Sequence, residues 1–295
     1  MKNEFVIPLS QVDIGQISMV GGKNASLGEM IQKLSRKGVN VPGGFVLTAT
    51  AYWHFLDQNQ IRDRLAQLMA ALKNDEFNLQ ETSASAMNTI LSADFPKDLA
   101  FSIETSFEQF QFVNKDSQVA VRSSATAEDL PEDSFAGMQE TYLNISTKTE
   151  LLLACKHCFA SLFTARAIKY REEKGYDHMR VALSVGIQKM VRSDLAASGV
   201  AFTLDPDTGF SNVINISATW GLGENLVKGE ITPDEFYVFK PSLINGKKSI
   251  ITRKKGDKEK TMTYVKGKSY GTLHTKTANK STPLKKRLEF SISDQ

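Results

Sequence analysis

The sequence predicts an α+β protein with two lobes, and three patterns support this class. Apolar residues at helical spacing dominate the first part of the chain, and short alternating strands separated by Gly and Asp-Pro turns dominate the second. With 295 residues, 41% of them hydrophobic, the chain is long enough to bury a large core and close to the size at which one core divides. We expect a mixed helical and strand lobe over residues 1–178 and a sheet-rich lobe over residues 179–295.

The first lobe is expected to alternate helices with short strands. Residues 23–37 carry apolar side chains on one helical face, after Gly21-Gly22, and Gly38 ends this helix. The further helices are expected over residues 52–72, 74–114 and 150–174, and the strands over residues 45–47, 118–122 and 141–145. In the second lobe we expect strands over residues 181–191, 200–203 and 213–217, followed by a basic hairpin or loop segment over residues 246–287.

The positive charge of the chain is concentrated in that late segment. The formal net charge is only +3, but residues 246–287 hold 14 basic and two acidic residues, so this segment carries +12 and the remainder −9. Clustered lysines can bind a nucleic-acid backbone, yet no aromatic platform accompanies them here. We interpret the segment as a solvated hairpin and predict no nucleic-acid partner.

Hydropathy and cysteine usage favour a cytoplasmic protein. The N-terminal residues MKNEFVIPLS lack the apolar core of a secretory signal, and no apolar run approaches the ~20 residues that span a bilayer. Cys155 and Cys158 are too few for a disulfide framework or a structural zinc site. We expect both on the buried face of a helix and predict no contact with a membrane.

Two basic residues are placed where a protein can bind phosphate. Lys23 follows two glycines at the expected start of a helix, where free backbone N–H groups and the helix dipole favour an anion. Arg122 ends an apolar strand and is followed by two serines, so its guanidinium would project from a rigid element. A turn with a solvated lysine and an ordinary strand-end ion pair are the alternatives for these two positions.

The loop after Arg122 and two later segments add polar groups suited to a nucleotide. Gly137 and Thr141 belong to a small-residue stretch that either folds over phosphates or forms a surface loop. Gln188 interrupts an apolar strand just before Met190, and an amide beside apolar side chains suits a purine, although a strand glutamine more often faces solvent. Glu224 follows a glycine turn, where it suits ribose hydroxyls or helix capping.

Several long motifs, in order, resemble one family. The strings VGGKNASLGEM, AVRSSATAEDLPEDSFAGMQETYLNI, KYREEKGYDH, ALSVGIQKMVRSDLAASGVAFTLDPDTGF and WGLGENLVKGEITPDEFYVFKP are similar to the N-terminal nucleotide-binding domain of phosphoenolpyruvate synthase. That family is related to pyruvate phosphate dikinase and to rifampin phosphotransferase. The resemblance covers residues 20–241 and implies an ATP-grasp fold whose two lobes hold ATP.

The resemblance also implies roles for individual residues. By motif, the phosphate-binding lysine and arginine of the family fall on Lys23 and Arg122, the glycine and threonine of its phosphate-covering loop on Gly137 and Thr141, and its adenine-side glutamine on Gln188. Met190 and Glu224 are further nucleotide-site candidates. The family uses ATP, Mg²⁺ and water to convert pyruvate to phosphoenolpyruvate, AMP and phosphate.

Parts of the family pattern have no counterpart in this sequence. The D-I-E-W-like strand with its metal-binding glutamate, the Q-A-R-P-like strand, the phosphohistidine domain and the pyruvate-binding barrel are absent. None of the histidines lies in the G-G-x-T-x-H setting of the phosphohistidine, and they are His54, His157, His178 and His274. We therefore expect a second lobe truncated before its final strands, with no catalytic residue and no metal ligand in this chain.

These observations leave three functions to compare. The first is the ATP-binding portion of a phosphoenolpyruvate synthase, inactive alone. In the complete enzyme it would work with a phosphohistidine domain and a pyruvate barrel, and the enzyme can form a homodimer. The second is a catalytically incompetent nucleotide-binding remnant or partner module. The third, within the family, is the ATP domain of a rifampin phosphotransferase.

Overall fold

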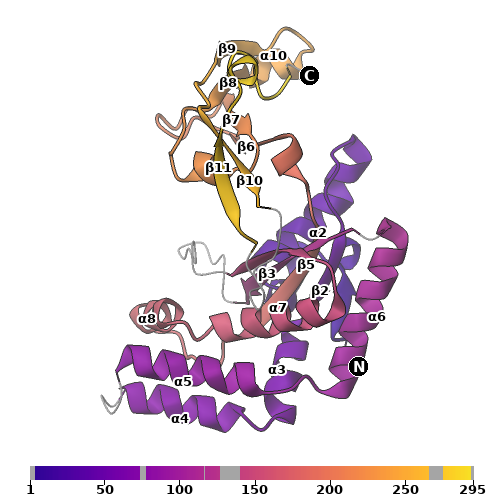
Figure 1. Cartoon of the computed structure of the whole chain (residues 1–295), viewed down its shortest axis with the longest axis vertical. Coiled ribbons are helices and arrows are strands. Elements are labelled where there is room, and N and C mark those ends of the chain that lie inside the picture. Colours follow the sequence, from indigo (N-terminus) through magenta and orange to yellow (C-terminus); the bar gives the residue numbers. More distant parts are fainter. Residues whose placement is uncertain (1–3, 74–77, 116, 127–139, 266–274, 294–295) are drawn as a thin grey trace. The chain divides into compact units, whose positions relative to one another are not determined.

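The computed structural model describes residues 4–73, 78–115, 117–126, 140–265 and 275–293 (Figure 1). The chain forms two compact units, Met1–Met190 and Val191–Gln295. Each unit has an antiparallel sheet of its own, and the long helices belong to the first, which confirms the predicted α+β class. The boundary follows β5 (Leu183–Lys189), a strand that we predict in the second lobe, because β5 is hydrogen-bonded on both sides within the sheet of unit 1.

Unit 1 is built on a five-stranded antiparallel sheet in the order β1-β2-β5-β3-β4. The other four strands are β1 (Val6–Pro8), β2 (Gly44–Leu47), β3 (Val119–Ala125) and β4 (Thr141–Ile145). Although β5 is the last strand of this unit in sequence, it lies at the centre of the sheet and is buried from Leu183 to Gln188. The residues around position 186 therefore lie beside those around positions 46 and 122.

Helices cover the two faces of this sheet differently. On one face, α1 (Ile17–Val20) and α2 (Gly22–Leu34) pack with β1 and β2 in a cluster of Ile7, Leu9, Val12, Val20, Ala25 and Val46. On the other face lies α7 (Lys148–Ser161), which contacts β3, β4 and β5 and places His157 5.8 Å from the ring of Tyr142. α3 (Ala49–Gln58) packs on α7 through Tyr52, Phe55 and Phe159.

The remaining helices of unit 1 are α4 (Arg62–Lys73), α5 (Leu79–Ser92), α6 (Lys97–Asn114) and α8 (Ala165–Glu173), and Figure 1 shows α4 and α5 side by side. The helix that we predict over residues 74–114 is divided into α5 and α6 at residues 93–96, and two other long helices that we predict are also each broken. The first breaks between α3 and α4 at Gln60, whose φ of 55° lies in the left-handed region. The second breaks between α7 and α8, where the hydroxyl of Thr164 caps α8 by accepting from the Ala167 N–H.

The segment from Lys148 to Glu173 is the only described helical stretch whose length and composition would suit a membrane, but 61% of its apolar window is buried within the structure. Such burial is typical of a core helix in a soluble protein. Cys155 and Cys158 are fully buried in α7, as predicted, and burial raises the pKa of both thiols well above the ordinary range. Neither cysteine is therefore suited to nucleophilic chemistry.

Unit 2 contains a four-stranded antiparallel meander and a separate two-stranded ribbon. The meander runs in the order β6 (Ala197–Phe202), β7 (Val213–Trp220), β8 (Asp234–Phe239) and β9 (Ile250–Lys254). The ribbon pairs β10 (Lys260–Tyr264) with β11 (Thr277–Ser281), and short helices α9 (Glu224–Val227), α10 (Lys240–Ile244) and α11 (Leu284–Arg287) complete the unit. The described part of the basic segment thus supplies three strands: β10 and β11 pair antiparallel, as in the predicted hairpin, whereas β9 joins the meander.

Candidate functional site

Lys23 lies exposed in the first turn of α2, and the turn before it requires glycine. Gly21 has φ +74° and ψ 157°, a conformation that other residues rarely adopt. A Cβ at Gly21 would also overlap the Ser124 hydroxyl of β3. The two requirements together bring the start of α2 directly against the sheet and place Lys23 at the N-terminal end of the helix, where the helix dipole favours an anion.

Arg122 and Thr141 lie directly opposite each other on β3 and β4. Both residues are exposed, although all the remaining residues of β3 are buried. Since paired residues of an antiparallel sheet point to the same side, the guanidinium and the hydroxyl leave the same face. This face is opposite the one that α7 covers. Tyr142, which follows Thr141, packs against His157 of α7, and its strand partner Val121 precedes Arg122. Successive residues of a strand point to opposite faces, so Arg122 and Thr141 point away from α7.

Gln188 is not the solvent-facing glutamine of an ordinary strand, because it is only 9% exposed. Its side-chain Nε2 donates to the Pro42 carbonyl at 2.9 Å. Two residues later, the backbone N–H of Met190 donates to the Gln118 carbonyl at 2.9 Å, so this N–H is not available to a purine. The Gln188 Oε1 and the apolar side chain of Met190 remain as groups that can contact a base.

The sheet register brings Arg122, Thr141 and Gln188 to one face. Arg122 is paired with Gly186 of β5, and Gln188 lies two residues further along the same strand. Such diagonal neighbours have backbones about 7–8 Å apart and share a face. The start of α2 packs on the same face, because the Asn24 amide donates to the Ser184 hydroxyl of β5 at 3.1 Å. One cation on a helix N-terminus and a second on the neighbouring strands form a donor set suited to phosphate oxygens.

The other predicted site residues are not brought into this group by the described structure. Gly137 lies outside the described residues. Glu224 belongs to unit 2, where it begins α9 and forms an ion pair with Lys228 at 2.6 Å. For nucleotide binding, its role stays a prediction.

The described histidines occupy structural positions. His54 lies 2.9 Å from the Asp98 carboxylate, and His178 Nδ1 accepts from Arg171 Nε at 3.0 Å. His157 packs near Tyr142, while His274 lies outside the described residues. Among the residues that the structure describes, no group of three or more His, Cys, Asp or Glu side chains is placed to hold a metal ion. The described donor set therefore does not fit a protein-bound Mg²⁺.

Three residues that help to shape this face are not predicted from the sequence. Asn24, Ser184 and Pro42 hold Lys23, β5 and Gln188 in place through hydrogen bonds, as described above. The available signal was the polar Asn24 at an otherwise apolar or small position of the helix start, next to the lysine. No local pattern indicates that Asn24 and Ser184, 160 residues apart, are in contact.

Comparison with known proteins agrees with this geometry. Residues 17–295 match the family described as "Pyruvate phosphate dikinase, AMP/ATP-binding domain". The chain belongs to this family. It is 48% identical over 293 residues to a phosphoenolpyruvate synthase of Aquifex aeolicus, 47% identical over 283 residues to that of Helicobacter pylori, and 43% identical over 292 residues to that of Escherichia coli.

These alignments cover 98%, 95% and 99% of this chain but only 34%, 34% and 36% of the respective relatives. The chain therefore spans about a third of the length of the phosphoenolpyruvate synthases that it matches. The match confirms the resemblance and the homology to an ATP-binding domain.

Proposed function

We propose that this chain is the ATP-binding portion of a phosphoenolpyruvate synthase with an ATP-grasp fold. The observation that carries the proposal is the common face of unit 1, on which Arg122, Thr141 and Gln188 lie beside the N-terminus of α2 and Lys23. In the complete enzyme, ATP, pyruvate and water would yield AMP, phosphoenolpyruvate and phosphate. The AMP/ATP-binding family and the names of the relatives support this assignment.

In this proposal, Lys23 and Arg122 bind the phosphates and stabilise the charge that develops during phosphoryl transfer. The Thr141 hydroxyl and the N-terminal end of α2 add an uncharged donor and a favourable dipole beside them. Gln188 Oε1 faces the base. The substrate is Mg·ATP, and its metal is carried by the phosphates, since the described residues offer no carboxylate cluster for it.

The rest of the reaction belongs to parts that this chain does not show. We propose that a phosphohistidine domain carries the phosphoryl group to a pyruvate-binding barrel, in a cytoplasmic enzyme that can form a homodimer. The 295-residue chain alone is then expected to make no phosphoenolpyruvate. Detection of pyruvate-dependent AMP formation by the purified chain would contradict this expectation.

Isothermal titration of the chain with Mg·ATP tests the ATP site. We expect micromolar binding that is weakened about 10-fold or more in Lys23→Ala and in Arg122→Ala, because each removes a charged partner of the phosphates. Lys33→Ala is the matched control, since Lys33 lies exposed on the same helix and pairs only with Glu29 in the described contacts. Equal losses in Lys33→Ala and Lys23→Ala would contradict the assignment of Lys23.

The main alternative is a nucleotide-binding remnant or partner module without catalytic use. An absence of Mg·ATP binding would support a partner module over the ATP-binding portion. The ATP domain of a rifampin phosphotransferase is a further alternative. The identity of 42–48% to phosphoenolpyruvate synthases, over 82% or more of the chain, favours the synthase.

A further inference from the structure

We propose that Asn24 is a positioning residue that fixes Lys23 over the phosphate-binding face of the sheet. This inference rests on the proposed function, because it assumes that Lys23 binds a phosphate. Asn24 is only 2% exposed, so it cannot reach a nucleotide itself. Its neighbour Lys23 is exposed, and any influence of Asn24 on binding must act through the position of the helix start.

Both amide hydrogens of Asn24 are used to hold that position. Nδ2 donates to the Val20 carbonyl at 2.9 Å and to the Ser184 hydroxyl at 3.1 Å. Ser184 in turn donates to the Leu47 carbonyl at 2.6 Å. The resulting chain of buried hydrogen bonds connects the end of α1 with β5 and β2, and it leaves the first turn of α2 little freedom to shift.

The sheet is shaped to accept this side chain. A Cβ at Gly186 would overlap the Asn24 Oδ1, so glycine is needed for Asn24 to lie on β5. Gly186 is also the residue paired with Arg122. Asn24 therefore lies over the strand position that is paired with Arg122, one proposed phosphate ligand. It also directly follows Lys23, the second proposed ligand, in the sequence. The contact of Asn24 with β5 thus sets the spacing between Lys23 and Arg122.

The choice of asparagine follows from the donors that the site needs. An aspartate has nearly the same shape but cannot donate, and it would place a charge against the Val20 carbonyl. Asn24→Asp therefore removes the two hydrogen bonds to Val20 and Ser184 with little change in side-chain volume. Because a small displacement of a binding group can reduce its contribution strongly, we expect Asn24→Asp to weaken Mg·ATP binding about 10-fold.

A double-mutant cycle with Lys23→Ala separates positioning from general stability. If Asn24 acts through Lys23, Asn24→Asp weakens Mg·ATP binding about 10-fold in the Lys23 chain but less than about 2-fold in the Lys23→Ala chain. Ser184→Ala should reproduce part of the loss in the same background-dependent manner. An equal loss in both backgrounds, or no loss in either, would overturn the proposal.

Ser83→Ala provides the matched control, since Ser83 also makes one buried hydrogen bond, to the Phe163 carbonyl at 2.8 Å, but lies on α5. It should lower the urea midpoint without changing the affinity for Mg·ATP. If the unmodified chain binds no Mg·ATP, the proposed function of the chain fails, and amide hydrogen exchange then decides the inference. Faster exchange at residues 25–28 in Asn24→Asp, but not in Ser83→Ala, would support the positioning role of Asn24, since Ala25 N–H begins the hydrogen bonds of this helix, and unchanged exchange would overturn it.

Discussion

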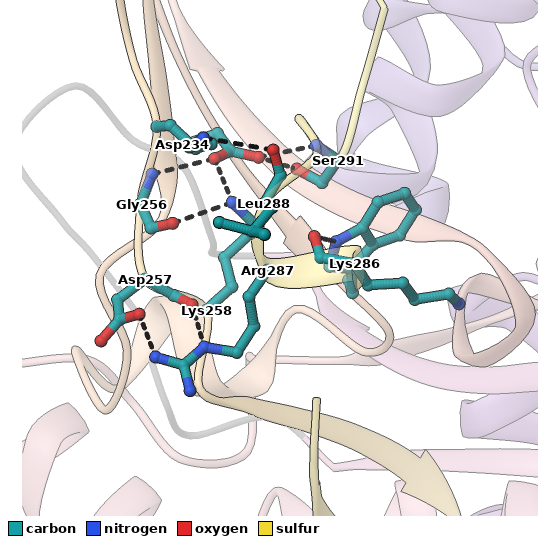
Figure 2. A network of polar contacts seen from close by, with 10 residues as sticks. Asp234, Gly256, Asp257, Lys258, Lys286, Arg287, Leu288 and Ser291 are labelled. Carbon is teal, nitrogen blue, oxygen red and sulfur yellow. Dashed lines mark hydrogen bonds and ion pairs between the residues drawn. The ribbon is translucent and has the colours of Figure 1, made fainter. Parts of the chain in front are cut away.

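Asp234 and Lys258 form an ion pair in unit 2 in which neither side chain is exposed to solvent. Figure 2 shows the contacts around it: the Asp234 carboxylate also accepts from the Gly256 N–H at 2.9 Å and from the N–H and hydroxyl of Ser291 at 2.6 and 2.7 Å. Lys258 donates additionally to the Gly256 carbonyl at 2.9 Å. Residue 291 is thereby tied to the start of β8, far away in sequence.

The first prediction concerns the removal of one partner of this pair. Lys258→Met leaves a buried carboxylate without its cation, and Asp234→Asn leaves a buried ammonium without its anion, so each should destabilise the chain by about 3–5 kcal/mol. The double variant should be destabilised by clearly less than the sum, because no charge remains unpaired. Urea denaturation of the four proteins measures this coupling, and additive losses would contradict it.

A second prediction follows from His178. Burial, and secondarily the positive charge of Arg171, lowers the pKa of His178 to about 4, whereas an unfolded histidine titrates near 6.5. The unfolded chain therefore binds a proton at a higher pH than the folded chain does. Stability is retained above about pH 6.5 and is lost as the pH falls towards 4, by about 3 kcal/mol in total.

Urea denaturation at several pH values between 7 and 4 checks this dependence. His178→Gln keeps an acceptor for Arg171 Nε but cannot titrate, so its stability should fall less over the same range. Asp177 opposes the shift and Glu172 lies 4.0 Å from His178 Nε2, which makes these two carboxylates the other charges that face the ring. Equal pH slopes for both proteins would show that His178 contributes nothing.

A third prediction uses a glycine inside α2. Replacing a glycine in the interior of a helix by alanine usually stabilises a protein by up to about 1 kcal/mol. At Gly28, however, a Cβ would overlap the Val12 carbonyl oxygen and lie 2.9 Å from the Leu9 carbonyl oxygen. Gly28→Ala should therefore destabilise the chain by about 1–3 kcal/mol, because the helix must move away from this segment.

Ser26→Ala is the matched control for Gly28→Ala, since Ser26 lies exposed on the same helix. It should leave the thermal midpoint nearly unchanged or raise it slightly, owing to the better helix propensity of alanine. An increase in stability in Gly28→Ala would contradict the close contact between α2 and residues 9–12.

The local pattern of the chain predicts most elements of this fold but not their assembly. The helix that begins after Gly21 and ends at Gly38 was predictable because capping glycines and helical spacing are local signals. The interruption at Thr164 was not, because the apolar spacing continues across it and only the N-cap hydroxyl marks the new helix. The central place of β5 depends on pairing with residues at least 58 positions away, such as Ala125 with Leu183, which no local pattern encodes.

The candidate site shows the same division. The motifs predict Lys23, Arg122 and Thr141 as phosphate-binding candidates, but only the sheet register shows that Thr141 lies opposite Arg122. The burial of Lys258 could not be predicted, because a lysine in a basic, polar segment is ordinarily solvated. It is buried only because Asp234, from a different strand, supplies both charge and hydrogen bonds.

The fourth prediction concerns the proposed contact between Gln188 and the base of the nucleotide. The Pro42 carbonyl can only accept a hydrogen bond, so the amide nitrogen of Gln188 must point to it, at 2.9 Å, and Oε1 remains as an acceptor. An acceptor in this place favours the 6-amino group of adenine and disfavours the carbonyl oxygen of guanine. We expect Mg·ATP to bind about 3–10-fold more tightly than the triphosphate of purine riboside, which lacks the amino group.

Gln188→Met, which keeps the length of the side chain but removes the amide, should reduce this preference to less than about 2-fold, since one hydrogen bond is lost for ATP and none for the analogue. Gln111→Met is the matched control, because the Gln111 amide also donates to a backbone carbonyl, that of Ser146 at 3.2 Å, but lies on α6. Isothermal titration with both nucleotides measures the preference. If Gln188→Met discriminates as strongly as the unmodified chain, Gln188 does not bind the 6-amino group.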